Sequence, residues 1–500
     1  MARSNVWPLL LALILCAVLV RFPEMAVVPA PTDETDELLV ALSIYRDGAR
    51  PLSTSEPYLG PLHVYLISLA YTLLGPSFEA GRALSVVMGA LVVPAAWLLA
   101  RTLAGRVAGN FSALVMLCAF GPVVLGSHVA WSHGYAPTLL AGSLAALAAS
   151  AHGSRPRATA FSAGLLGALA VGAHPTVLVL LPGAVLWWLI AHETAMAHRL
   201  RLSLWVFAGL LVGYAPTLWF LATRGIAPFL DRLVEHDYVG GETTAWAAGV
   251  VQWLEGLARN LAGPPMAQPA DPRLWLMVAL IAAGLVASAR LGQWLPLATV
   301  ISGALLMPLL VDGTKFTSLT GLRYAAPALP AAAAGIGVWA RSWWEAGSAR
   351  RTAIVLIAVG AIAAQAWTLL AYYRFVERQG VTGRPVLEVV DGLIAGASTQ
   401  DAIFIDDDIE TKLTGGGEVG RAVADLLTLR GVAYTKAKKD KIRWFLANGD
   451  GASYDLVLSG NAADVLTSEF QLTAVRVVPV VEGQVSRTGA YWGWYRSGAR

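Results

Sequence analysis

Long apolar blocks separated by short polar turns fill most of the chain up to about Tyr372. A helix needs about 20 predominantly apolar residues to cross a bilayer, so repeated blocks of this length predict a polytopic α-helical membrane protein. We predict about eleven spans, at residues 6–20, 82–101, 107–126, 134–151, 158–172, 176–191, 203–222, 274–289, 294–310, 324–340 and 352–372.

One apolar stretch, residues 61–74, is too short to cross, and we predict a helix that lies at the membrane interface. If it does not cross, the arginines of the short turns share a side with the N-terminus, as the positive-inside rule requires. These arginines are Arg101, Arg106, Arg155, Arg157, Arg199, Arg201, Arg290, Arg341, Arg350 and Arg351. We therefore predict a cytoplasmic N-terminus, with an acidic first loop (29–81), a long loop (223–272) and the C-terminus on the outer side.

The pattern changes after residue 373, where apolar runs shorten and charges return. Alternating segments predict helices at 386–397, 419–430 and 436–446, and strands at 402–405, 432–434, 454–458, 472–481 and 491–495. We expect two domains, a transmembrane domain at 1–373 and a small extracytoplasmic α/β domain at 374–500.

Composition narrows the function classes. Of the 500 residues, 56% are hydrophobic and only 14% are charged, and a net charge of +3 does not suggest a nucleic-acid partner. Cys16 and Cys118 both lie in apolar segments, so neither a disulfide framework nor a zinc site is expected. The Ala-, Gly- and Arg-rich, Lys-poor composition indicates a bacterial source, which would place the protein in a bacterial cytoplasmic (inner) membrane.

The first outer loop carries four carboxylates close together: Asp33, Glu34, Asp36 and Glu37. Acids so close to a bilayer are costly and indicate a function. Acids also favour the first turn of a helix, and residues 33–45 have that pattern. Both interpretations can hold, because a helix that starts here would also orient a catalytic carboxylate.

Basic side chains gather at the outer ends of the predicted spans. They are His128, His133, His174, Lys315 and Arg323. A coupled transporter usually places such groups near the middle of the bilayer. Carboxylates and cations together at the outer face instead favour an enzyme that acts on a lipid head group, with a general base and phosphate-binding cations.

Several motifs resemble the GT-C fold glycosyltransferases, and most closely the family-39 type that includes protein O-mannosyltransferases and lipid A aminoarabinose transferases. The motifs are Asp33-Glu34-Thr35, Gly48, Tyr58-Leu59-Gly60-Pro61-Leu62, Leu73-Leu74-Gly75, Arg82-Ala83-Leu84-Ser85, and Gly321-Leu322-Arg323-Tyr324 with Pro327 and Pro330. Val234-Glu235-His236 is similar to a short motif of the aminoarabinose transferases. The resemblance covers about residues 6–372.

The resemblance implies a polyprenyl monophosphate sugar as donor and Asp33 as the base that acts on the acceptor, with Asp36 as its rival. Glu34 would orient the acceptor or bind a divalent cation, and no other cofactor is expected. The chain has no lysine before Pro61, where the family binds the lipid phosphate. The candidates that could bind the phosphate instead are His63, His174, Lys315 and Arg323, and Tyr324, Glu235 and His236 are further candidate substrate-binding residues.

We therefore expect a membrane glycosyltransferase that moves a sugar from a polyprenyl-phosphate donor to a lipid, a cell-envelope glycan or a protein. Two alternatives remain open. One is a transporter or flippase of lipid-linked glycans, and the other is a non-catalytic subunit of an envelope assembly.

Overall fold

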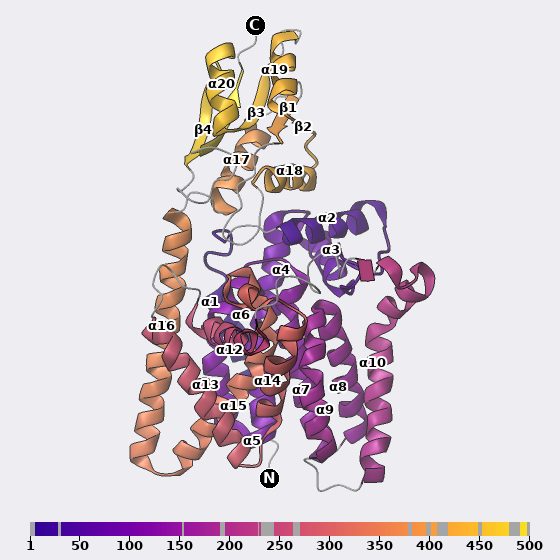
Figure 1. Cartoon of the computed structure of the whole chain (residues 1–500), viewed down its shortest axis with the longest axis vertical. Helices are drawn as coiled ribbons and strands as arrows, with labels where there is room; N and C mark the ends of the chain where they lie inside the picture. The colour runs from indigo at the N-terminus through magenta and orange to yellow at the C-terminus, as the bar shows by residue number, and fades with distance from the viewer. Residues whose placement is uncertain are drawn as a thin grey trace. The chain divides into compact units, whose positions relative to one another are not determined.

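The computed structural model (Figure 1) forms two compact units, which we describe separately. The first unit contains Met1–Pro23, Arg50–Leu66 and Ala83–Ala371, and the second contains Glu24–Ala49, Ile67–Arg82 and Tyr372–Arg500. The structure describes residues 6–28, 32–152, 155–190, 196–228, 230–231, 245–263, 271–378, 383–396, 402–407, 419–448, 453–479 and 491–497.

The first unit is helical. Its α-helices are α1 (Trp7–Arg21), α5 (Val92–Leu117), α6 (Phe120–Ser127), α7 (Ala136–His152), α8 (Pro156–Ala173), α9 (Leu181–Ile190), α10 (Met196–Arg224), α12 (Trp246–Ala262), α13 (Pro272–Arg290), α14 (Leu295–Leu306) and α15 (Leu329–Glu345). Short 3₁₀ turns connect them: η1 (Ser132–Tyr135), η2 (Pro175–Val179), η3 (Met307–Leu309), η4 (Gly313–Thr317), η5 (Thr320–Tyr324) and η6 (Ala326–Ala328). Three helices have residues in both units: α3 (Leu62–Leu74), α4 (Phe78–Ala90) and α16 (Ser348–Arg378).

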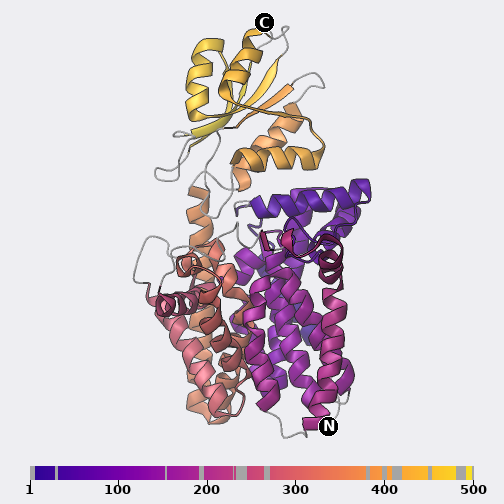
Figure 2. The ribbon, with the colours of Figure 1, turned by 45° about the vertical axis from the view of Figure 1, so that its right-hand side comes forward.

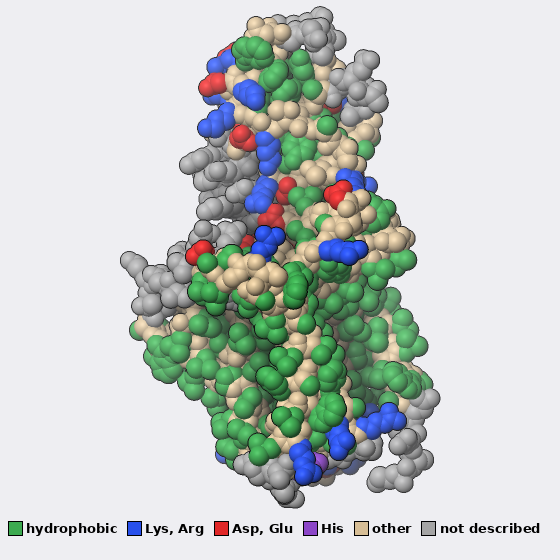
Figure 3. All heavy atoms as spheres, turned by 90° about the vertical axis from the view of Figure 1, so that its right-hand side faces the viewer, with side chains coloured by type: hydrophobic (Ala, Val, Ile, Leu, Met, Phe, Trp, Pro, Cys, Tyr) green, Lys and Arg blue, Asp and Glu red, His purple; other side chains and the backbone are tan. Residues whose placement is uncertain are grey.

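Five helical segments of the described chain are long and apolar enough to cross a membrane. They are Phe78–Leu117, Ser132–Ala151, His198–Arg224, Pro272–Arg290 and Ser348–Val376. Large apolar side chains such as Leu204, Trp219, Leu356 and Trp367 are exposed on them. Figure 3 shows the resulting hydrophobic surface of the helical part. Exposed apolar surface on this scale fits a lipid environment, and the chain is a multi-pass membrane protein.

Helix α5 contains a chain reversal. The indole of Trp97 donates a hydrogen bond to the side chain of Asn110 at 3.0 Å, although residues 13 positions apart in a straight helix lie about 20 Å apart. The backbone leaves the helical conformation at Ala104 and Gly105, where Gly105 has a φ of +84° that favours glycine. Two antiparallel segments therefore meet between Arg101 and Arg106, where the sequence predicts a turn between spans.

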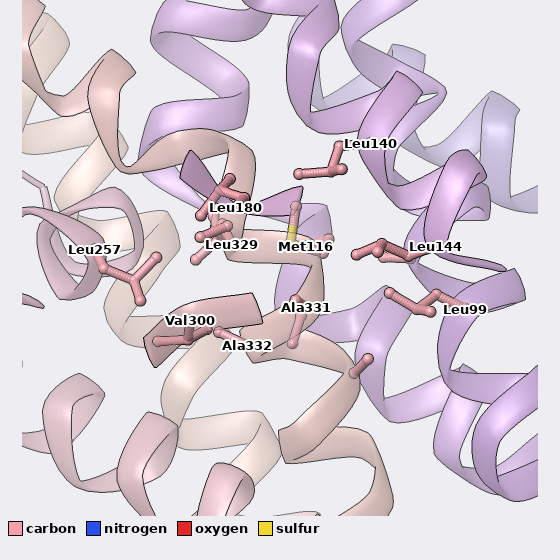
Figure 4. Close-up of a cluster of buried hydrophobic side chains, with 14 of the residues drawn as sticks. Leu99, Met116, Leu140, Leu144, Leu180, Leu257, Val300, Leu329, Ala331 and Ala332 are labelled. Atoms are coloured by element: carbon pink, nitrogen blue, oxygen red, sulfur yellow. The ribbon is translucent and has the colours of Figure 1, made fainter. Parts of the chain in front are cut away.

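Aliphatic side chains from many helices fill the core of the first unit. Figure 4 shows Leu99 and Met116 of α5, Leu144 of α7 and Val300 of α14 converging on α15. The facing part of α15 is built of alanines, Ala331–Ala334, all of them buried. Such small side chains allow helices to approach closely.

The predictions for residues 61–74 and for the loop 223–272 have different outcomes in the structure. Helix α3 has 13 residues, which is too short to cross a bilayer, as expected for residues 61–74. The predicted loop 223–272 contains a helix, α12, that the sequence analysis missed. Its buried Trp253, Leu257 and Leu261 follow helical spacing, but Gly and Pro residues on both sides obscure it.

The second unit contains a mixed five-stranded sheet of order β2-β1-β3-β5-β4. The strands are β1 (Ala402–Asp406), β2 (Thr435–Ala437), β3 (Tyr454–Ser459), β4 (Thr473–Pro479) and β5 (Tyr491–Arg496). β1 pairs in parallel with β2 and β3, and β5 pairs antiparallel with β3 and β4. The register sets Phe404 beside Leu456 and Val457 beside Trp494.

Helices flank this sheet (Figure 2). They are α17 (Gly383–Gly396), α18 (Val419–Arg430), α19 (Lys439–Asn448) and α20 (Gly460–Phe470). Helix α18 has the bounds predicted from sequence. Strand β2 begins at Thr435, three residues later than the start of the predicted strand at 432–434, and α20 was not predicted. The unit also includes the acidic helix α2 (Thr32–Asp47).

Candidate functional site

The acidic helix α2 is anchored at its first turn by a buried ion pair. Arg82 donates to both carboxylate oxygens of Glu34, at 2.8 Å from Nε and 2.7 Å from Nη2. The side chains of Arg82 and Glu34 are 1% and 0% exposed. Nη1 of Arg82 also donates to the carbonyls of Met25 and Val28, and the guanidinium lies 4.2 Å from the ring centre of Phe78. Glu34 is therefore tied to the segment that precedes its own helix.

The two candidate bases on α2 have different surroundings. Asp33 lies in the first turn and is partly exposed. Asp36, its rival, forms an ion pair with Arg421 of α18 at 2.5 Å, and both side chains are partly exposed. Residues three apart on a helix lie on the same side, so Asp33 and Asp36 are neighbours. A nearby arginine offsets the repulsion that two adjacent carboxylates would otherwise have.

In the first unit, the structure brings together three of the predicted substrate-binding residues. The His174 ring lies 5.7 Å from the Tyr324 ring at right angles, and the Arg323 guanidinium lies 5.2 Å from the Tyr324 ring centre. Arg323 also faces Trp131 at 5.3 Å. His133 completes the group, with its ring 4.3 Å from that of His174. We call these five side chains the basic–aromatic cluster.

His174 offers one nitrogen of its ring to a ligand. It lies between α8 and η2 with 3% of its surface exposed. Its Nδ1 accepts a hydrogen bond from the backbone N–H of Thr176 at 3.2 Å, so a neutral ring carries its proton on Nε2. That Nε2 is buried and has no hydrogen-bond partner among the described residues. An unsatisfied buried donor is costly and is often explained by a bound group.

An apolar cavity of about 310 Å³ adjoins this cluster. Aliphatic side chains of α8 and α10 line it, among them Leu165, Leu169 and Val212. Polar side chains line it as well: His63, Ser132, Tyr135, Tyr214 and Thr217.

One hydrogen bond shapes the cavity wall, and a second one connects the cavity with the cluster. Gly60 donates from its N–H to the carbonyl of Gly172 at 2.7 Å, which fixes the start of α3 against the end of α8. Ala173, another cavity residue, accepts a hydrogen bond from Nδ1 of His133 at 3.3 Å. A Cβ on Gly60 would lie 3.3 Å from the Gly172 backbone, so this contact requires small residues.

The loop between α14 and α15 carries Lys315 on η4 and Arg323 on η5. Lys315 is partly exposed, and the described part of the chain provides no ion-pair partner for it. Gly321 packs directly on this loop, since a Cβ there would lie 1.5 Å from the Lys315 carbonyl oxygen. The loop conformation therefore depends on glycine at this position.

Two predicted residues, Glu235 and His236, lie outside the described residues. In the part of the chain that the structure describes, no group of three or more His, Cys, Asp or Glu side chains could hold a metal ion. Sequence reasoning quoted Arg82 only as part of a motif and missed its pairing with Glu34. It placed His133 among the basic residues at the outer face but did not select it as a substrate-binding residue, and it did not select Trp131 or Tyr135 either.

Comparison with known proteins tests the predicted fold. Searches against protein-family models and against curated proteins find no match. Among solved structures, the chain is similar to ArnT from Cupriavidus metallidurans bound to undecaprenyl phosphate. The TM-score is 0.61 at 14% identity, over 99% of this chain and 98% of that one.

Two further structures agree. ArnT in the apo state has a TM-score of 0.60 at 13% identity, over 99% and 98% of the two chains. The apo oligosaccharyltransferase of Archaeoglobus fulgidus has a TM-score of 0.53 at 13% identity, over 94% of this chain and 70% of that one. At these identities the likeness establishes the fold, and the predicted resemblance is confirmed at that level. The chain has the GT-C fold and resembles ArnT over nearly its whole length.

Proposed function

We propose that the protein is a membrane glycosyltransferase that takes a sugar from a polyprenyl-phosphate donor and transfers it to an acceptor hydroxyl or amine. A shared fold alone does not define an activity, so the argument rests on the site. The observation that carries the proposal is the apolar cavity beside a cluster that contains the cation of Arg323 and a His174 nitrogen that is buried and has no hydrogen-bond partner among the described residues.

The cavity and the cluster suit the two ends of a lipid phosphate. A prenyl chain from the bilayer can enter a cavity with apolar walls, such as those formed by Leu165 and Leu169, without exposing hydrocarbon to water. A phosphate is bound by donors and cations, and the cluster supplies both. ArnT shares the fold, and its crystal structure contains bound undecaprenyl phosphate. A polyprenyl-phosphate donor therefore fits this chain.

We assign the chemistry as follows. Asp33 takes the proton from the acceptor hydroxyl or amine, and the acceptor electron pair attacks the anomeric carbon. The bond from that carbon to the phosphate oxygen breaks, and polyprenyl phosphate leaves with the bonding electrons. Arg323 and His174 stabilise the charge on the departing phosphate, and Lys315 is a third candidate. Glu34 is better suited to positioning than to binding, because Arg82 occupies both of its oxygens.

Three finer statements belong to the proposal. They are the eleven spans with a cytoplasmic N-terminus, the bacterial cytoplasmic membrane, and the family-39 type. A reporter enzyme fused after residue 400 should lie on the outer side of the membrane and show its activity there. Activity of that fusion in the cytoplasm would reject the orientation.

The test is transfer by the purified protein in lipid nanodiscs, with a labelled polyprenyl-phosphate sugar and a panel of lipid, glycan and protein acceptors. Release of polyprenyl phosphate that depends on an acceptor supports the proposal. Asp33→Asn should abolish transfer, whereas Asp47→Asn, at the exposed far end of the same helix, should leave it unchanged. An active Asp33→Asn variant together with an inactive Asp36→Asn variant would move the base to Asp36. No release with any acceptor would count against a transferase.

A further inference from the structure

Helix α18 of the C-terminal sheet domain packs on the acidic helix α2 through a connected set of polar contacts. The hydroxyl of Thr35 donates to Oδ2 of Asp425 at 2.7 Å. Arg421 pairs with Asp36 at 2.5 Å and lies 3.7 Å from the same oxygen of Asp425. Thr35 and Asp36 are adjacent on α2, and Arg421 and Asp425 are one turn apart on α18, so the four groups form a chain of polar contacts that runs from Thr35 through Asp425 and Arg421 to Asp36. Figures 1 and 2 both show α18 alongside α2.

The contact continues along both helices. Arg46, in the last turn of α2, donates to the carbonyl of Leu429 at 3.2 Å. This carbonyl lies at the C-terminal end of α18, where a cation is favoured by the helix dipole. At the same end, Arg430 lies 3.5 Å from Glu79 of α4. α18 is therefore held along its length by charged groups from the acidic segment.

These contacts fall on the residues that directly follow the proposed base. Glu34 is held by Arg82, Thr35 by Asp425 and Asp36 by Arg421. Successive helix residues point about 100° apart, so three anchored neighbours fix both the rotation and the tilt of the first turn. Two of the three anchors come from α18.

We propose that Arg421 and Asp425 are positioning residues for the reaction, which set the orientation of Asp33 by holding Thr35 and Asp36. The inference rests on the proposed function, since it assumes that Asp33 is the base. It assigns a role to the C-terminal domain: its helix α18 completes the support of the catalytic helix.

If the contact between α2 and α18 only stabilised the fold, its loss would have a different effect from the loss of a contact that positions Asp33. Loss of an exposed ion pair usually changes stability little, wherever it lies. Loss of a positioning contact lowers kcat, because reacting groups must be aligned closely, while donor affinity is retained. The chain offers a matched control in Arg443, which pairs with Glu469 in the same domain. That pair is 38% and 39% exposed, compared with 40% and 31% for Arg421 and Asp36.

The first experiment compares kcat and donor KM in nanodiscs. We expect Arg421→Gln and Thr35→Val to lower kcat roughly tenfold to a hundredfold, with donor KM within about twofold of the wild type. Thr35→Ser keeps the hydroxyl and should retain most of kcat, and Arg443→Gln should behave as the wild type. The charge exchange Asp36→Arg with Arg421→Asp should recover part of the loss that Arg421→Gln causes.

The second experiment measures hydrogen exchange of residues 32–47 in the same purified proteins. Exchange should rise in Arg421→Gln and Thr35→Val but not in Arg443→Gln. Unchanged kcat in both Arg421→Gln and Thr35→Val would overturn the inference, even if exchange rises. Unchanged exchange of residues 32–47 in these two variants would also overturn it. If the wild type itself shows no transfer, the proposed function fails, and the exchange data still decide whether α18 holds the helix.

Discussion

Replacement of Glu34 by Gln tests how the acidic helix is anchored. Glu34 and Arg82 are almost completely buried and joined by two hydrogen bonds of 2.8 and 2.7 Å. The substitution keeps the size of the side chain but removes its charge. The Arg82 guanidinium then stays buried without a charged partner at Glu34, although it still donates to the carbonyls of Met25 and Val28.

The expected cost follows from the burial of the pair. Loss of one partner from a buried ion pair typically lowers the free energy of unfolding by about 3–5 kcal/mol. Arg82→Met should cost more than Glu34→Gln, because it also leaves the Met25 and Val28 carbonyls without their donor, at about 1–3 kcal/mol each. The double variant should cost less than the sum of the single ones, since neither charge then remains.

The assay is thermal unfolding in nanodiscs, followed by tryptophan fluorescence, with hydrogen exchange of residues 32–47 as the local measurement. Glu345→Gln is the control. It removes an exposed pair with Arg341, 56% and 42% exposed, worth about 0–1 kcal/mol. If Glu34→Gln changes neither the unfolding midpoint nor the exchange of α2 by more than this control, the buried pair does not anchor the helix and the reasoning is wrong.

Three further predictions follow from the same structure. Gly321→Ala should raise donor KM and cost roughly 1–3 kcal/mol in unfolding free energy, because its Cβ would meet the Lys315 carbonyl; an unchanged KM and midpoint would contradict the packing of this loop. Leu165→Trp should raise KM more for a long-chain than for a short-chain prenyl donor, because the indole occupies part of the cavity; equal effects would remove the chain from this cavity. Burial raises the pKa of the Asp425 carboxyl above its ordinary value of 3.8, so the folded state binds that proton more tightly than the unfolded chain. The stabilisation is complete below pH 3.8 and is lost as the pH rises through the folded-state value. The thermal unfolding midpoint of the wild type, relative to that of Asp425→Asn, should therefore decrease when the pH is raised from 4.5 to 7.5. An increase would show that ion pairing outweighs burial.

The sequence predicted elements whose signals are local. Helix α18 was predicted with its observed bounds because its buried apolar residues repeat with helical spacing over its whole length. Helix α20 was missed, although Ser459 caps it by accepting a hydrogen bond from the Ala462 N–H. The signal was present in Ser459, but the buried face that follows consists mostly of small residues, Gly460, Ala462 and Ala463, which mark a helix less clearly than the leucines of α18.

Pairings between distant residues could not be predicted in this way. Glu34 and Arg82 lie 48 positions apart, and Thr35 and Asp425 lie 390 apart. Charge and hydropathy patterns describe which residues are polar, but not which distant partner each one meets. For the same reason, the sequence suggested His174 and Arg323 separately, and only the structure joined them through Tyr324 and His133.

The acidic cluster now has a physical account. Like charges within one helical turn repel one another, and four carboxylates would destabilise α2 if each stayed uncompensated. The helix N-terminus favours negative charge, but only by about 0.3–1 kcal/mol per group at exposed positions. The structure adds one arginine at Glu34 and another at Asp36, and each comes from a different element. These arginines lower the electrostatic cost of a carboxylate at Asp33 and fix its helix at the same time. Glu34 and Asp36 therefore act as attachment points, which accounts for two of the three carboxylates that lie beside the proposed base.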